Sequence, residues 1–127
     1  TVVVLVTPYR QPACQFLLEI PAGGLEDGED PQPAAARELE EGIGVTAAKI
    51  KKLAEFYVSP GFLTEKMYLF LATELTETAQ NLDEDEFVEI ERYSFPQALE
   101  LIRNGGIEDA KTIVGLMLAA TRYGHSL

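Results

Sequence analysis

The chain has 127 residues, 46% of them hydrophobic, and a formal net charge of -11 at pH 7. This length suffices for one hydrophobic core and not for two, so we expect a single domain over residues 1–127. The acidic charge disfavours nucleic-acid backbones and membrane surfaces as partners and favours metal cations. The single cysteine, Cys14, excludes an intrachain disulfide. With no recognisable signal peptide or membrane span, we expect a cytoplasmic protein.

Two apolar segments near the N-terminus predict β-strands. Residues 2–7 (VVVLVT) are mostly β-branched and aliphatic, which is typical of a strand buried on both faces. Residues 16–20 (FLLEI) predict a second, short strand that runs into the turn at Pro21. Arg10 stands between the two segments, and an arginine at a strand end is most often a solvated charge.

A glycine turn and a helix rich in carboxylates follow the second strand. Gly23 allows a tight backbone turn, and Asp30 followed by Pro31 is a favourable N-cap and first-turn pair. The residues beyond Pro31 are mostly strong helix formers. We therefore expect a helix that begins near Pro31 and ends at Gly42 or Gly44.

Two glutamates of this predicted helix, Glu38 and Glu41, are three positions apart and so share one face. Like charges at this spacing repel each other unless a cation lies between them. A carboxylate cluster with room for water is the kind of ligand set that Mg2+ prefers. The helix is therefore a candidate metal site, and the alternative is an acidic amphipathic helix without a site.

The next part of the chain predicts three further strands. Residues 50–58 and 66–74 are strand-like and are joined by residues 59–65, where a Pro-Gly pair indicates a turn. The acidic run DEDE at residues 83–86 is most simply a solvated loop. Residues 87–93 alternate apolar and charged side chains, which predicts a half-buried strand.

Two helices are predicted at the C-terminal end. Ser94 is a good N-cap for a helix that ends at the glycines after Asn104. A last helix is expected from Asp109 to about Tyr123, with apolar side chains at the spacing of ordinary core packing. His125 follows in a tail that we expect to fray, so we assign it no role.

The glycine turn and its helix resemble the Nudix box, G-x5-E-x7-R-E-U-x-E-E-x-G-U, in which U is aliphatic. The residues that set the register are Gly23, Glu29, Arg37, Glu38, Leu39, Glu41, Gly44 and Val45. One position departs from the pattern, because Gly42 stands where the box has its last glutamate. That glutamate is usually a metal ligand in the family. The substitution leaves the fold assignment intact and puts the metal affinity and the reaction rate in question.

Three further strings resemble the ADP-ribose pyrophosphatase branch of this family. They are LEIPAGGLEDGE, similar to E-L-P-A-G-x-x-x-x-G-E, SPGFLTE, similar to S-P-G-x-x-x-E, and GGIEDAKTIVGL, similar to G-x-I-x-D-A-K-T. The resemblance covers Val4 to Leu116 and implies the Nudix fold, an α/β/α sandwich around a mixed sheet. It also implies that the first strand and the N-terminal sheet of many relatives are missing from the chain.

The resemblance implies a metal site and a catalytic group. The ion, Mg2+ or alternatively Mn2+, would be held by the Ala22 carbonyl and by Glu38, with Glu41 as a nearby acidic ligand or orienting group. The catalytic residues would be Arg37, which orients the box glutamates through ion pairs, and Glu84 of the acidic loop as the general base, with Glu86 as the second choice. The residues implied on the substrate side are Arg10 at a phosphate, Glu65 and Phe62.

The function that the resemblance implies is hydrolysis of a nucleoside diphosphate sugar, with ADP-ribose first, giving AMP and ribose 5-phosphate. UDP-glucose is a second substrate candidate, and oxidised-nucleotide sanitation is disfavoured by the S-P-G-x-x-x-E string. The alternative from another class is a silent module that binds nucleotide sugars or a protein partner, which Gly42 favours. A homodimer is compatible with the resemblance, and we expect no nucleic-acid or membrane partner.

Overall fold

The computed structural model describes residues 2–6, 9–10, 15–78 and 89–127. Its contacts divide the chain into two compact units. One unit consists of residues 1–21 together with residues 84–127, and we call it the terminal unit. The other consists of residues 22–83, which contain the Nudix-box segment, and we call it the box unit.

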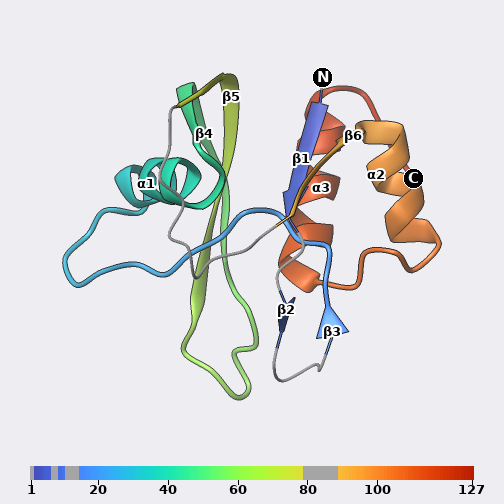
Figure 1. Ribbon diagram of the computed structural model, residues 1–127. Coiled ribbons are helices and arrows are strands. Elements are labelled where there is room, and N and C mark those ends of the chain that lie inside the picture. Colours follow the sequence, from blue (N-terminus) through green and yellow to red (C-terminus); the bar gives the residue numbers. More distant parts are fainter. Residues whose placement is uncertain (1, 7–8, 11–14, 79–88) are drawn as a thin grey trace. The chain divides into compact units, whose positions relative to one another are not determined.

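In the terminal unit, two strands that are far apart in sequence form an antiparallel pair. Strand β1 (Val2–Val6) pairs with β6 (Ile90–Ser94), so that Val2 lies opposite Ser94 and Val6 opposite Ile90 (Figure 1). This confirms the strand predicted at residues 2–7. Helix α2 (Phe95–Arg103) contacts β1, β6 and helix α3 (Ala110–Arg122). The apolar side chains buried in this unit are Val3, Leu5, Val6, Phe95, Ala98, Leu99, Ile107, Leu116, Ala119 and Ala120.

The strand predicted at residues 16–20 is not continuous. Strand β2 (Tyr9–Arg10) pairs with a two-residue strand β3 (Gln15–Phe16), and beyond β3 the described residues form an isolated bridge between Val6 and Glu19. Two backbone hydrogen bonds of 2.7 Å hold this bridge, one in each direction. The bridge and the β2–β3 pair share one antiparallel register, with Val6 opposite Glu19, Tyr9 opposite Phe16 and Arg10 opposite Gln15.

The C-terminal helices begin where their cap residues predict. The hydroxyl of Ser94 accepts from the N–H of Gln97 and the Gln97 side chain accepts from the N–H of Ser94, which is a complete capping box. The carboxylate of Asp109 caps α3 by accepting from the N–H of Thr112. In the tail expected to fray, the ring of His125 stacks on Phe95 at 5.3 Å between centroids, whereas Leu127 is exposed.

In the box unit, helix α1 (Pro31–Ile43) has the predicted length and end. Gly44 ends it in a left-handed conformation with φ 69°, and its N–H donates to the carbonyl of Glu40 at 3.1 Å. Asp30 is the N-cap residue as predicted, but its side chain makes no capping hydrogen bond. Ala34 and Ile43 are the buried residues of α1, and the helix contacts strands β4 and β5.

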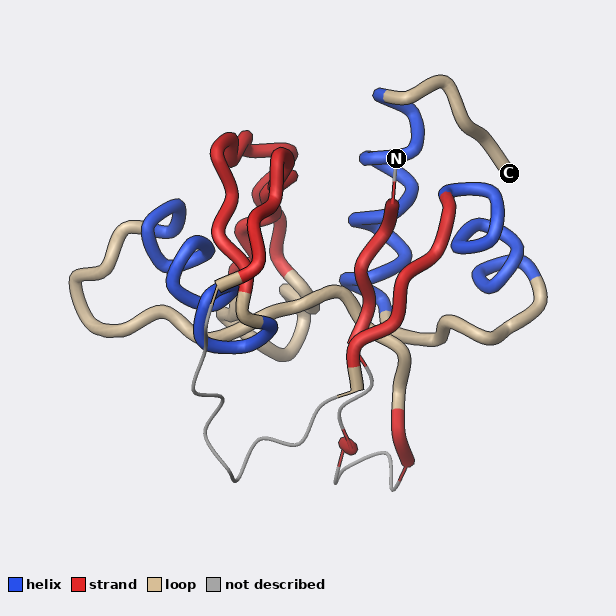
Figure 2. Tube along the Cα trace, turned by 45° about the horizontal axis from the view of Figure 1, so that its top comes forward, coloured by secondary structure: helices blue, strands red, loops and turns tan. Residues whose placement is uncertain are grey.

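Strands β4 (Val45–Tyr57) and β5 (Lys66–Glu77) form a long antiparallel ribbon with α1 beside it (Figure 2). Both strands extend beyond the ranges predicted from sequence, because Val45 pairs with Glu77 at the far end of the ribbon. A bulge interrupts the register between Lys52 and Ala54. Every strand pair in the described ranges is antiparallel.

Candidate active site

The carboxyl group of Glu38 lies against the backbone of Gly23. A Cβ atom built on Gly23 would overlap the carboxyl carbon and both oxygens of Glu38, whereas a Cβ atom built on Gly24 would meet nothing within 4 Å. Helix α1 supplies Glu38 and the preceding loop supplies Gly23, the residue directly after Ala22. The box unit therefore brings the helix carboxylate to the turn whose carbonyl was predicted to share a metal ion with it.

Arg37 is the centre of the ion-pair network in this loop and helix. Its Nε and Nη2 donate to the two oxygens of Glu29 at 3.0 and 2.9 Å. Its Nη1 donates to Glu38 at 3.1 Å and to Glu41 at 3.2 Å, and Nη2 also reaches the carbonyl of Gly24 at 3.3 Å. One guanidinium thus joins the loop, through Glu29 and the Gly24 carbonyl, to Glu38 and Glu41 on its own helix.

The bidentate contact between Arg37 and Glu29 shifts the pKa of both groups. The hydrogen bond to Glu29 raises the pKa of Arg37 above its ordinary value, and the same contact lowers the pKa of the Glu29 carboxyl. Both groups are therefore charged at neutral pH. The network brings three carboxylates to one guanidinium, so acidic groups outnumber the cation in it.

The donor set fits a hard divalent cation, which prefers carboxylate and carbonyl oxygens. Within residues 2–6, 9–10, 15–78 and 89–127, no three His, Cys, Asp or Glu side chains are grouped closely enough to hold a metal ion. The three glutamates are instead spread around Arg37. Metal binding at Ala22, Glu38 and Glu41 would therefore require these carboxylates to turn from the guanidinium toward the ion.

Gly42 lies inside α1, one residue after Glu41. A Cβ atom at this position would meet nothing within 4 Å, and the residue does not have a positive φ. The helix therefore has room for the glutamate that the box pattern places here. The missing carboxylate is a change in chemistry and not a consequence of backbone geometry.

The predicted substrate loop is an exposed turn at the end of the β4–β5 ribbon. The N–H groups of Phe62 and Leu63 donate to the carbonyl of Ser59 at 3.0 and 2.8 Å. Phe62 is 91% exposed and Glu65 is also exposed, so neither contributes to the Arg37 network. The general-base candidates Glu84 and Glu86 lie outside the described residues.

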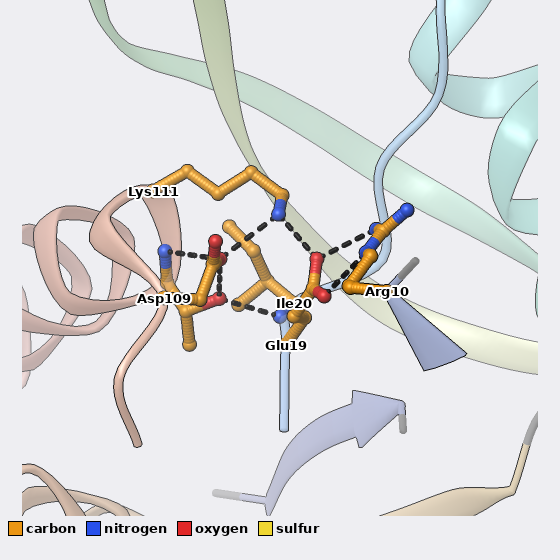
Figure 3. Close-up of polar contacts among 6 residues, drawn as sticks. Arg10, Glu19, Ile20, Asp109 and Lys111 are labelled. Atoms are coloured by element: carbon orange, nitrogen blue, oxygen red, sulfur yellow. Dashed lines mark hydrogen bonds and ion pairs between the residues drawn. The ribbon is translucent and has the colours of Figure 1, made fainter. Parts of the chain in front are cut away.

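Arg10 belongs to a second network, in the terminal unit (Figure 3). Its Nε and Nη2 donate to the two oxygens of Glu19 at 2.6 and 2.7 Å. The ammonium of Lys111 also contacts Glu19 and reaches Asp109 at 2.9 Å. Glu19 is only 1% exposed, so its carboxylate is buried between two cations.

Glu19, Asp109 and Lys111 were given no site role in the sequence analysis. Glu19 lies in the LEIPAGGLEDGE string, and Asp109 and Lys111 lie in the GGIEDAKTIVGL string, but both strings served only to identify the family branch. The signal that could have found them is a glutamate inside a buried run, which requires cationic partners elsewhere in the chain. Those partners are 9 and 92 positions away.

Burial alone would raise the pKa of the Glu19 carboxyl, but the hydrogen bonds from Arg10 and Lys111 outweigh it and lower the pKa. Burial likewise opposes ionisation of Asp109, and hydrogen bonds from Thr112 and Lys111 lower its pKa nevertheless. Both carboxylates are therefore ionised at neutral pH. The terminal unit holds a balanced group of two anions and two cations.

In the described part of the chain, no helix is long and apolar enough to cross a membrane.

Comparison with known proteins gives consistent matches. The family model of the NUDIX domain matches residues 2–114. An ADP-ribose pyrophosphatase of Bacillus subtilis is 46% identical over 112 residues, covering 87% of this chain and 60% of that protein. A methanol dehydrogenase activator of Bacillus methanolicus is 42% identical over 116 residues, covering 90% of this chain and 63% of that protein.

Other matches are more distant in sequence. A GDP-mannose pyrophosphatase of Yersinia pestis is 37% identical over 131 residues, covering 95% of this chain and 65% of that protein. The crystal structure of an ADP compounds hydrolase has a TM-score of 0.87 at 23% identity and covers 97% of this chain and 66% of that one. That likeness shows a shared fold. The chain spans about two thirds or less of the length of these relatives.

The family match covers most of the chain, and within the box Glu38 lies against Gly23 while Arg37 contacts Glu38 and the carbonyl of Gly24. The chain therefore belongs to the Nudix family and has the Nudix fold.

Proposed function

We propose that residues 1–127 form one Nudix domain that hydrolyses the diphosphate of nucleoside diphosphate sugars, with ADP-ribose as the first substrate. Relatives named for ADP-ribose and GDP-mannose support this substrate class. The observation that carries the proposal is the approach of the Glu38 carboxyl group to Gly23, the residue that follows Ala22. Arg37 holds the remaining box carboxylates within the same loop and helix.

Nudix hydrolases generally use divalent metal ions, and we propose Mg2+ for this chain, with Mn2+ as a substitute. Ala22, Glu38 and Glu41 would hold the ion, and Arg37 would orient Glu29, Glu38 and Glu41 through its ion pairs. When bound, the ion neutralises diphosphate charge and polarises water. The missing carboxylate at Gly42 predicts weaker metal binding than in a domain with the full box, by about tenfold or more.

The remaining steps belong to groups of the chain itself. Arg10 would contact a phosphate of the substrate, and Phe62 and Glu65 would lie on its sugar or base side. Glu84, with Glu86 as the second choice, would accept a proton as water attacks one phosphorus. The bond from that phosphorus to the bridging oxygen then breaks, and ADP-ribose gives AMP and ribose 5-phosphate.

The test is the release of AMP from ADP-ribose at millimolar Mg2+ or Mn2+, with EDTA as the metal-free control. UDP-glucose and GDP-mannose are compared under the same conditions, which orders the substrates. The variant Glu38→Gln keeps the size of the side chain and removes its charge, so it should lose most of the activity. Activity that is unchanged in Glu38→Gln or in EDTA would contradict the proposed site.

A second candidate function is binding without turnover, either of a nucleotide sugar or of a protein partner. Gly42 favours it, because the box lacks one of its carboxylates. A relative named as a methanol dehydrogenase activator is consistent with a protein partner. Tight binding of ADP-ribose by calorimetry, with no AMP formed even in Gly42→Glu, would select this function. A homodimer and a cytoplasmic location stay predictions of the sequence.

A further inference from the structure

With the described residues of the terminal unit, the guanidinium of Arg10 uses one of its two hydrogen-bonding edges. The edge formed by Nε and Nη2 donates to both oxygens of Glu19. The third nitrogen, Nη1, points away from the cluster (Figure 3). The Arg10 side chain is 46% exposed, whereas that of Glu19 is 1% exposed. One edge is therefore fixed on a buried carboxylate while the side chain as a whole stays accessible.

The carboxylate that holds Arg10 is itself fixed from several directions. The backbone of Glu19 pairs with Val6 in both directions at 2.7 Å. Lys111 contacts the Oε1 atom of Glu19, and its ammonium is held in turn by Asp109 at 2.9 Å. These contacts leave little freedom for the Glu19 side chain, so the orientation of the Arg10 guanidinium is fixed in turn.

Helix α3 anchors this arrangement to the rest of the terminal unit. Asp109 accepts from the hydroxyl of Thr112 at 2.6 Å and from its N–H at 3.2 Å. The same hydroxyl accepts from the N–H of Ile20 at 2.9 Å. The residue after Glu19 is therefore tied to the first turn of α3. Arg10 is oriented by a chain of contacts that reaches from the strand bridge to a helix.

A fixed guanidinium with a free edge is suited to binding a phosphate group. Arginine carries five N–H donors, and Glu19 takes two of them. The planar fork of the remaining edge matches two oxygens of a phosphate. Because the side chain is already ordered, ligand binding loses less conformational entropy than it would with a mobile arginine.

We propose that Glu19 is a positioning residue, supported by Lys111, that presents the free edge of Arg10 to a phosphate of the bound ligand. The inference rests on the proposed function, because it takes the ligand to be a diphosphate. A purely structural role for the network is the competing explanation. It would neutralise the buried carboxylate without any effect on ligand binding.

The variant Arg10→Lys separates the two explanations. An ammonium can still pair with Glu19 and so keeps the buried charge neutralised, but it lacks a second planar edge. We expect KM for ADP-ribose to rise about tenfold with kcat changed less than threefold, and the urea midpoint of unfolding to stay the same. Arg103→Lys is the matched control, because it makes the same replacement at an exposed arginine of the terminal unit that pairs with Glu100 and lies outside this network. It should change neither KM nor the urea midpoint.

Glu19→Gln completes the series, since it keeps one acceptor oxygen but removes the charge that holds Arg10. We expect it to raise KM as Arg10→Lys does. If Glu19→Gln does not fold, the KM of Arg10→Lys tests the inference instead. Calorimetric binding of inorganic pyrophosphate provides a readout that needs no turnover. Loss of pyrophosphate binding in Arg10→Lys supports the inference even if no nucleotide sugar is hydrolysed.

Two results would overturn the inference. If the wild type hydrolyses ADP-ribose and Arg10→Lys has the same KM and the same pyrophosphate affinity, the network is structural and the proposed function stands. If the wild type binds neither pyrophosphate nor ADP-ribose, both the inference and the proposed function fail.

Discussion

The carboxyl group of Glu38 occupies the space in which a side chain would begin at Gly23. Glycine at this position therefore decides where the helix carboxylate can lie. The neighbouring Gly24 has no such role, because a Cβ atom there would meet nothing within 4 Å. The contact links the first glycine of the box to its first helix glutamate through space as well as through sequence.

This contact predicts different effects for two adjacent substitutions. Gly23→Ala should leave the fold intact, because the overlapping atoms are the flexible end of a side chain that can turn away. The displaced Glu38 should then bind metal about tenfold more weakly or worse. A titration of activity against Mg2+ concentration measures this loss. Gly24→Ala is the control and should titrate like the wild type, and equal curves for both variants would exclude the role given to Gly23.

The glutamate missing from the box can be restored without a steric conflict at Gly42. Gly42→Glu should increase activity at submillimolar Mg2+ by about tenfold, because a carboxylate ligand is added. Gly42→Ala and Gly42→Gln are matched controls for helix propensity and side-chain size. Each should stabilise the fold by about 0.5–1 kcal/mol at most without the gain in activity. The same activity in all three variants would mean that the site uses other ligands.

Arg37 contacts Glu29 through Nε and Nη2, and it contacts both Glu38 and Glu41 through Nη1. An ammonium group cannot reproduce this set of contacts, so Arg37→Lys should lower kcat/KM by more than tenfold while circular dichroism stays unchanged. Arg103→Lys is a control in the terminal unit, where an exposed arginine pairs with Glu100. Wild-type kcat/KM in Arg37→Lys would show that the charge alone suffices.

The buried network of the terminal unit predicts how stability depends on pH. The folded-state pKa values of Glu19 and Asp109 lie below their ordinary values. As the pH falls, the unfolded chain therefore binds protons before the folded chain does. The stability from these groups is complete above about pH 5 and is lost as the pH falls through the folded pKa values.

Urea unfolding at a series of pH values between neutral and about pH 3 measures this loss of stability. Lys111→Met removes a cation that lowers both pKa values, so its unfolding free energy should fall less steeply with pH than that of the wild type. A parallel pH dependence in the two proteins would show that Lys111 does not hold these carboxylates in solution.

Local patterns predicted the parts of the fold that depend on neighbouring residues. Helix α1 ends at Gly44 because glycine adopts the left-handed conformation there, and α2 begins with the capping box at Ser94. Contacts between distant residues were not predictable in the same way. The burial of Glu19 depends on Lys111, 92 positions later, and the early start of β4 depends on its pairing with Glu77.

The box motif predicted which residues form the candidate site but not their arrangement around Arg37. The motif specifies residue types and spacing, whereas the bidentate contact of Arg37 with Glu29 depends on the fold of the loop between them. The predicted contribution of Arg10 shows the same limit. Its sequence context suggested a phosphate contact, and only the structure shows the buried carboxylate that holds it.

The measurement that tests the account most directly is the release of AMP from ADP-ribose by the unmodified chain and by Glu38→Gln, each with Mg2+ and with EDTA. We predict AMP from the unmodified chain with Mg2+ and little or none in the other three reactions. Bound but intact ADP-ribose in all four reactions would contradict the hydrolase assignment and leave a binding domain.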